Sequence, residues 1–273
     1  MKPPTGWIRR MAFALGLLAL LYVAAIAWLY WRQERLLFYP EPWPAEEPAV
    51  VTAPDVHSVW IDVPGAKLHG LHLQQPNARG LVFYLHGNGG NAASWFVNAD
   101  FYRQAGFDLF MLDYRGYGRS SGAIASEAQL VEDVRTAWRQ LGPQYAGRPC
   151  VVLGRSLGTG LAAQLAAEVH PALTVLVSPY RSMQALAGEQ YPWVPGWVLR
   201  YPLRTDAVLA SIGGPILLVH GEQDELIPRR HPEALLAVAG AKARLLAVPR
   251  AAHNDIQDFD VYLEGLRTEL ARL

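Results

Sequence analysis

Residues 150–170 read CVVLGRSLGTGLAAQLAAEVH, and this stretch decides the fold. An apolar run, Cys150–Leu153, is followed by a glycine-rich turn and then by an alanine-rich segment, Leu157–His170, of good helix formers. A strand that passes directly into a helix through G-x-S-x-G, here residues 154–158, is typical of a sharp turn that exposes a serine above a sheet. The motif alone is a weak signal, so its interpretation depends on the elements around it.

Outward from this turn, short apolar runs alternate with amphipathic stretches. Such alternation requires parallel strand pairing, because a crossover helix must bridge each pair. The sequence therefore predicts an α/β fold, with a mainly parallel sheet and helices on both faces. The expected strands are Ser58–Val63, Leu68–Leu73, Leu81–Leu85, Phe107–Leu112, Cys150–Leu153, Leu173–Val177, Ile216–Val219 and Arg244–Val248. The expected helices are Ala92–Gln104, Glu127–Leu141, Leu157–His170, Pro232–Ala239 and Tyr262–Leu273.

The N-terminal region has a different composition. Residues 11–31 read MAFALGLLALLYVAAIAWLYW, an uncharged stretch that as a helix spans about 30 Å, the thickness of a bilayer core. Lys2, Arg9 and Arg10 precede it, and this excess of positive charge predicts a cytoplasmic N-terminus. A cleaved signal peptide with a small-residue site at residues 25–27 is the alternative, although the apolar run exceeds the roughly 7–15 residues usual there.

These features divide the chain into a cytoplasmic N-terminus (1–10), a transmembrane anchor (11–31), a proline-rich connector (32–56) and a globular domain (57–273). The domain is then exported, to the periplasmic side of the inner membrane in a Gram-negative cell. The formal net charge is zero and no block of Lys and Arg occurs, which argues against nucleic-acid binding. Cys150 is the only cysteine and lies in an expected strand, so no internal disulfide is possible.

Ser156 is the candidate nucleophile, and its hydroxyl needs a base, most often a histidine. Among the eight histidines, His253 follows the last expected strand, where its loop can reach over the C-terminal edge of the sheet. His86 and His220 each precede a glycine at a strand end and are interpreted as structural turn residues. We therefore expect His253 to be the general base.

Asp224 is the candidate acid, because it follows the strand that ends near His220 and gives the chain order serine, aspartate, histidine. Its carboxylate would hold the imidazole in the required tautomer and stabilise the imidazolium. The competing carboxylates are Glu222 and Glu225 on the same loop, and Asp113 at the end of an earlier strand, which more readily organises its own loop.

An oxyanion hole in such a site combines two backbone N–H groups. One is expected from Leu157, at the start of the helix after the nucleophile. The other is assigned to Asn88, in the loop HGNGGN (residues 86–91), whose glycines let the backbone approach a substrate.

The motifs LHGNGGN, DYRGYGRSSG, GRSLGTG, HGEQDELIP and AHND occur in this order, together with RQERLLFYP after the apolar segment. This combination resembles the membrane-anchored α/β-hydrolase-domain serine hydrolases, a branch that includes protein depalmitoylases. The resemblance runs from about Gln33 to the C-terminus. It implies hydrolysis of esters or thioesters by Ser156, Asp224 and His253 without metal or cofactor, on a small-molecule or acylated-protein substrate.

Two other functions stay open from the sequence: a peptidase or amidase of the same fold, and a non-catalytic binding protein that retains the fold. Residues 179–212 interrupt the strand–helix alternation and are rich in aromatic residues and prolines. They form either a small lid that shapes an apolar acyl-binding pocket, or an insertion whose aromatic residues pack onto the sheet.

Overall fold

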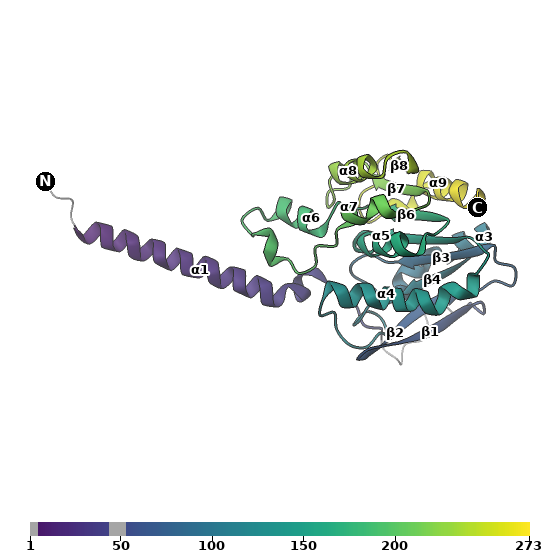
Figure 1. Cartoon of the computed structure of the whole chain (residues 1–273), viewed down its shortest axis with the longest axis horizontal. Helices are drawn as coiled ribbons and strands as arrows, with labels where there is room; N and C mark the ends of the chain where they lie inside the picture. The colour runs from purple at the N-terminus through teal and green to yellow at the C-terminus, as the bar shows by residue number, and fades with distance from the viewer. Residues whose placement is uncertain (1–4, 44–52) are drawn as a thin grey trace.

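The computed structural model describes residues 5–43 and 53–273, and one eight-stranded sheet organises the domain (Figure 1). The strand order is β1-β2-β4-β3-β5-β6-β7-β8. The pairs β1–β2 and β2–β4 are antiparallel and the other neighbours are parallel, which confirms the predicted mainly parallel sheet. The strands are β1 (Val56–Val63), β2 (Ala66–Leu73), β3 (Gly80–Leu85), β4 (Phe107–Leu112), β5 (Cys150–Arg155), β6 (Leu173–Val177), β7 (Ile216–Gly221) and β8 (Ala243–Val248).

Helices cover both faces of the sheet, as predicted. One face packs against α4 (Glu127–Leu141), α5 (Leu157–Val169) and α8 (Arg230–Ala239). The other face packs against α2 (Ala92–Trp95), α3 (Ala99–Ala105) and α9 (Asp260–Ala271). The remaining helices are α1 (Thr5–Leu37), α6 (Met183–Gln190) and α7 (Thr205–Val208).

Each central strand contributes side chains to both hydrophobic cores, because successive residues of a strand point to opposite faces. In β4, Phe110 and Leu112 belong to the core under α4 and α5, whereas Leu109 and Met111 belong to the core under α3 and α9. Burial on both faces is the reason that these strands are mostly apolar; Asp108 in β4 is an exception.

The helix predicted over Ala92–Gln104 is interrupted in the structure. Helix α2 ends at Trp95, a 3₁₀ turn follows over Phe96–Asn98, and α3 begins at Ala99. Asn91 and Ser94 form a capping box that fixes the first turn, and the buried Phe96 ring enters the core at the interruption. The helix is therefore interrupted where Phe96 is buried in the core, and the local sequence pattern did not predict this interruption.

Helix α1 extends away from the domain (Figure 1). Its segment Gly6–Leu37 is long and apolar enough to cross a membrane by length and composition, and only 6% of its most apolar window is buried. The predicted span, residues 11–31, lies within this helix. The helix continues to Leu37, however, so the first residues of the predicted connector are helical. Residues 44–52 of that connector lie outside the described residues.

The aromatic residues of the insertion at 179–212 fall into two groups. Tyr180 and Tyr201 are fully buried in the core, as the packing interpretation predicts. Trp193 and Trp197 are 53% and 70% exposed, so they do not serve to pack the insertion onto the sheet. The exposed pair is available for contact with a substrate or a membrane surface.

A buried polar network links His72 of β2 to Asp108 of β4 through Tyr145. Its Nε2 donates a hydrogen bond of 2.8 Å to the Tyr145 hydroxyl, which in turn donates one of 2.6 Å to Oδ2 of Asp108. Burial lowers the pKa of His72 to about 4, with a smaller contribution from nearby His57. The imidazole is therefore neutral in the folded protein at pH values where an exposed histidine is already protonated.

We expect His72 to make the protein less stable as the pH falls from about 6.5 to about 4, because only the unfolded chain binds the proton in that range. At about pH 5 the free energy of unfolding is about 2 kcal/mol lower than at neutral pH because of this residue. The variant His72→Gln retains a hydrogen-bond donor for Tyr145, and the decrease of its Tm between neutral pH and about pH 5 should be smaller than that of the wild type. His170→Asn removes an exposed imidazole and should follow the wild type. Equal pH dependence in His72→Gln would contradict this account.

Candidate active site

Ser156 lies at the junction of β5 and α5 with φ 47° and ψ −116°, a strained conformation for a residue with a side chain. The two flanking glycines make the junction possible. A Cβ at Gly158 would lie 2.1 Å from the carbonyl oxygen of Leu85, and one at Gly154 would lie 2.5 Å from the carbonyl oxygen of Gly158. Only glycine fits at these two positions, and the strained turn predicted from the G-x-S-x-G motif is present.

The structure brings the three predicted side chains into one hydrogen-bonded chain. Nε2 of His253 lies 3.0 Å from Oγ of Ser156, and Nδ1 of His253 lies 2.8 Å from Oδ2 of Asp224. Because an ionised carboxylate only accepts, Nδ1 carries the proton and Nε2 of the neutral ring is left to accept from the hydroxyl. This arrangement matches a nucleophile, its base and the group that orients the base.

The Asp224 side chain is fully buried, and its second oxygen accepts hydrogen bonds from the backbone N–H groups of Leu226 and Ile227. Burial raises the pKa of this carboxyl, but the hydrogen bonds from His253 and Ile227 outweigh it, and the pKa lies below its ordinary value. Asp224 is therefore ionised at neutral pH. The competing residues Glu222 and Glu225 are exposed.

The loop after β3 faces Ser156 closely. A Cβ at Gly87 would lie 3.6 Å from the Cβ of Ser156 and 3.1 Å from the ring of Trp95. On the other side of the serine, Leu157 is the first residue of α5, so its N–H has no acceptor within the helix. The two chain segments expected to supply oxyanion donors therefore flank the hydroxyl.

The Asn88 side chain has a role that the sequence did not reveal. Its Nδ2 donates a 2.6 Å hydrogen bond to the carbonyl oxygen of Leu37, the last residue of α1. Its Oδ1 accepts from the N–H of Tyr39 at 3.0 Å and from the hydroxyl of Tyr117 at 2.8 Å. These bonds connect the loop over Ser156 directly to the end of helix α1.

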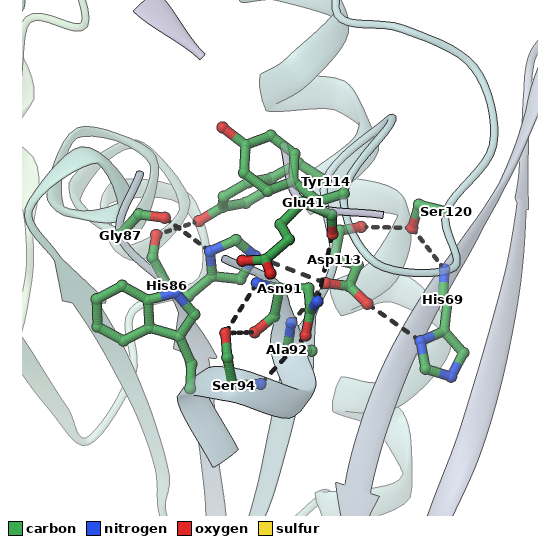
Figure 2. A network of polar contacts seen from close by, with 12 residues as sticks. Glu41, His69, His86, Gly87, Asn91, Ala92, Ser94, Asp113, Tyr114 and Ser120 are labelled. Atoms are coloured by element: carbon green, nitrogen blue, oxygen red, sulfur yellow. Dashed lines mark hydrogen bonds and ion pairs between the residues drawn. The ribbon is translucent and has the colours of Figure 1, made fainter. Parts of the chain in front are cut away.

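Asp113 anchors the other end of this loop, as Figure 2 shows. Its Oδ1 accepts a 2.6 Å hydrogen bond from the N–H of Ala92, and its Oδ2 accepts one of 3.1 Å from Nδ1 of His69. His86 donates from Nδ1 to the carbonyl oxygen of Gly87 at 2.7 Å, and burial lowers the pKa of His86. These contacts support the interpretation of Asp113 as a residue that organises its loop rather than as the acid.

Arg155, the residue before the nucleophile, is a further contributor that the sequence analysis missed. Its guanidinium is buried, donates 2.7 Å hydrogen bonds to the carbonyl oxygen of His253 and to Oε1 of Gln257, and lies over the ring of Trp95. It also lines a cavity of about 290 Å³ whose other lining residues come mainly from the segment after β3, from α3 and α9, and from the loop that carries His253. The residues around Arg155 in the sequence do not predict its contact with the distant loop of His253.

Comparison with known proteins agrees with this fold. A family model described as "Serine aminopeptidase, S33" matches residues 76–205. The uncharacterized protein Rv2307c of Mycobacterium tuberculosis is 30% identical over 263 residues, 92% of each chain. Alpha/beta hydrolase domain-containing protein 17B of Xenopus laevis is 31% identical over 202 residues, 72% of this chain and 68% of the relative. Among solved structures, the Pyrococcus furiosus esterase Pf2001 superposes with a TM-score of 0.69 at 18% identity, covering 86% of this chain and 97% of the esterase.

The chain belongs to the α/β-hydrolase superfamily. Membership supports a hydrolase activity, in agreement with the resemblance found in the sequence motifs.

The variant Asp113→Asn should lower the free energy of unfolding by about 1–3 kcal/mol. An amide has one acceptor oxygen in place of two, so its NH₂ group faces either the N–H of Ala92 or Nδ1 of His69, and in the second case the imidazole has to change its tautomer. Thermal unfolding of the purified variants measures the effect. The matched control is Asp62→Asn, whose side chain is 88% exposed and should leave Tm unchanged. Equal Tm values for the two variants would show that Asp113 does not hold the loop.

Proposed function

We propose that this protein is a serine hydrolase that cleaves carboxylic esters or thioesters through an acyl-enzyme intermediate. The observation that supports this most strongly is the hydrogen-bonded chain from Oγ of Ser156 through His253 to the buried carboxylate of Asp224. The fold, shared with a solved esterase, is consistent with it.

In the first step, Oγ of Ser156 attacks the acyl carbonyl carbon while Nε2 of His253 takes the hydroxyl proton. The tetrahedral intermediate carries an oxyanion, which the backbone N–H groups of Leu157 and Asn88 stabilise. Collapse of the intermediate expels the alcohol or thiol, which receives the proton from His253. Asp224 stabilises the imidazolium in the meantime, and its lowered pKa keeps it ionised.

In the second step, His253 activates a water molecule that attacks the acyl carbon, and Ser156 leaves with its proton restored. Nucleophile, base and oxyanion donors all come from this chain, so the proposed reaction requires no metal or organic cofactor.

A peptidase is the second candidate, since the matching family model is described as a serine aminopeptidase. An aminopeptidase has to bind a cationic α-amino group near the nucleophile. In the described part of the chain, neither the cavity beside Arg155 nor the groove beside α1 is lined by an Asp or Glu. Arg155 places a positive charge in the first of them. We therefore favour the esterase; turnover of an aminoacyl anilide at rates comparable with short-chain esters would favour the peptidase.

The membrane placement is part of the proposal. Helix α1 supplies one segment of sufficient length and apolarity, and the basic residues Arg9 and Arg10 lie at its N-terminal end. We propose a single-pass anchor with a cytoplasmic N-terminus at residues 1–10 and a hydrolase domain exposed on the exported side. The insertion at residues 179–212 then acts as a lid over the site.

The variant Ser156→Ala should lose labelling by a fluorophosphonate probe and lower p-nitrophenyl acetate turnover by more than about a thousandfold, since the nucleophile is absent. The matched control is Ser211→Ala, an exposed serine that should retain labelling and turnover. Labelling that persists in Ser156→Ala would overturn the assignment. A wild type that neither reacts with the probe nor hydrolyses esters would favour the non-catalytic binding protein.

Asp224→Asn should leave the fold intact and reduce kcat by a factor on the order of 10⁴, because the amide favours the wrong tautomer of His253. Steady-state hydrolysis of a short-chain ester, together with Tm, separates this effect from unfolding. Glu225→Gln, on the same loop, should retain full activity. If Glu225→Gln were the impaired variant instead, the acid would have been assigned to the wrong residue.

A further inference from the structure

An apolar groove of about 400 Å³ lies between helix α1 and the insertion at residues 179–212. One wall is the C-terminal third of α1, and the other is α6 with the segment after it. Residues that line it include Trp28, Leu29 and Leu36 from α1, and Gly188, Trp193 and Leu199 from the insertion. Helix α1 is thus more than a tether, because it supplies one wall of a cavity.

The two walls are held together by buried polar contacts. Nε2 of Gln33 donates to the carbonyl oxygen of Val198 at 3.1 Å, and Oε1 of Gln33 accepts from the N–H of Arg200 at 2.8 Å. Glu34 forms an ion pair with Arg200 and accepts a 2.8 Å hydrogen bond from the hydroxyl of Tyr201. These bonds fix α1 against the insertion and define the width of the groove.

The inner end of the groove lies beside the loop that faces Ser156. Leu37 and Tyr39 line the groove, and the backbones of both are hydrogen-bonded to the side chain of Asn88. Asn88 adjoins Gly87, which lies directly over Ser156. A molecule in the groove can therefore extend toward the nucleophile along the loop that is proposed to hold the oxyanion.

The outer end of the groove lies at the level of the predicted membrane span. The hydroxyl of Tyr22 donates a 3.0 Å hydrogen bond to the carbonyl oxygen of Trp193, and Tyr22 is inside the segment 11–31. Trp28 and Trp193, both more than half exposed, border this end. Aromatic residues of this kind concentrate at membrane interfaces, so the groove opens where acyl chains are present.

We propose that this groove binds the fatty-acyl chain of a membrane-resident ester or thioester, and that helix α1 is a wall of the acyl site. The inference rests on the proposed hydrolase function and deepens it. The chain enters from the bilayer between Trp28 and Trp193, and its carbonyl carbon reaches Ser156.

The lining suits this occupant and few others. No charged residue lines the groove in the described part of the chain. The amide groups of its two glutamines, Gln33 and Gln184, are hydrogen-bonded to the backbone. A flexible hydrocarbon chain needs no hydrogen bonds, and its burial is favourable in proportion to its apolar area. A cavity of about 400 Å³ falls within the range of small-molecule sites.

The test narrows the groove from each wall separately. Gly188→Leu projects a side chain into the groove, and a Cβ there meets no atom within 4 Å, so the helix should tolerate it. Leu36→Trp narrows the α1 wall at a position that is 42% exposed. The matched control is Gly16→Leu, the same substitution at an exposed position of α1 outside the groove, where a Cβ also meets nothing.

The full-length chain in mixed micelles is assayed with acetyl, octanoyl and hexadecanoyl p-nitrophenyl esters. The ratio of kcat/KM for the hexadecanoyl ester to that for the acetyl ester should fall at least about tenfold in both groove variants, since each excluded methylene costs about fourfold. Fluorophosphonate labelling of Ser156 verifies that each variant is folded. If Leu36→Trp does not label, Gly188→Leu decides the outcome.

An unchanged ratio in the folded groove variants would overturn the acyl site and favour another occupant, such as a partner's membrane helix. An equal fall in Gly16→Leu would also overturn it, because the effect would then come from the membrane helix in general. If Ser156→Ala loses all hydrolysis but the kcat/KM ratio of the groove variants is unchanged, the groove proposal is wrong and the proposed hydrolase function is retained. Hydrolysis that persists in Ser156→Ala instead removes the proposed function itself.

Discussion

The backbone of Ser156 holds a φ of 47°, and the rest of the site depends on the close packing that keeps it there. Such a conformation costs on the order of 1–3 kcal/mol, so the surrounding structure has to impose it. Strand β5 and helix α5 meet at Gly154 and Gly158, where no Cβ fits. The carbonyl oxygen against Gly158 belongs to Leu85, the last residue of β3. One contact therefore fixes both the turn that presents the nucleophile and the start of the loop that faces it.

The other two side chains reach Ser156 because β5, β6, β7 and β8 are parallel neighbours whose C-terminal ends lie along one edge. Asp224 follows the end of β7, and His253 follows the end of β8. Arg155 then closes the arrangement, since it extends from the end of β5 and binds the carbonyl oxygen of His253. The histidine loop is thereby attached to the strand that carries the nucleophile, which limits how far the base can move from the hydroxyl.

Local patterns were sufficient for the parts of the structure that local forces determine. Apolar runs predicted the strands, and the spacing of glycines around Ser156 predicted the strained turn that the structure contains. The sequence did not reveal the interruption at Phe96, the contact of Arg155 with His253 or the bond from Asn88 to Leu37. Each of these depends on residues that are distant in the chain or on burial in a core. Local periodicity and motifs do not predict such contacts, because neither partner is distinguished by the residues next to it in the sequence.

The contacts of helix α1 change what its anchoring would mean for the site. The prolines after residue 31 predict a stiff, extended connector, and such a spacer would hold the domain away from a membrane. The helix instead continues to Leu37, and Gln33 is buried against Val198 and Arg200. Separation of α1 from the insertion would break these hydrogen bonds, each of which contributes about 1 kcal/mol net to stability. The hydrogen bonds of Gln33 and Asn88 therefore connect α1 with the insertion and with the loop after β3, and the membrane anchoring proposed for α1 would fix the orientation of the groove beside this loop.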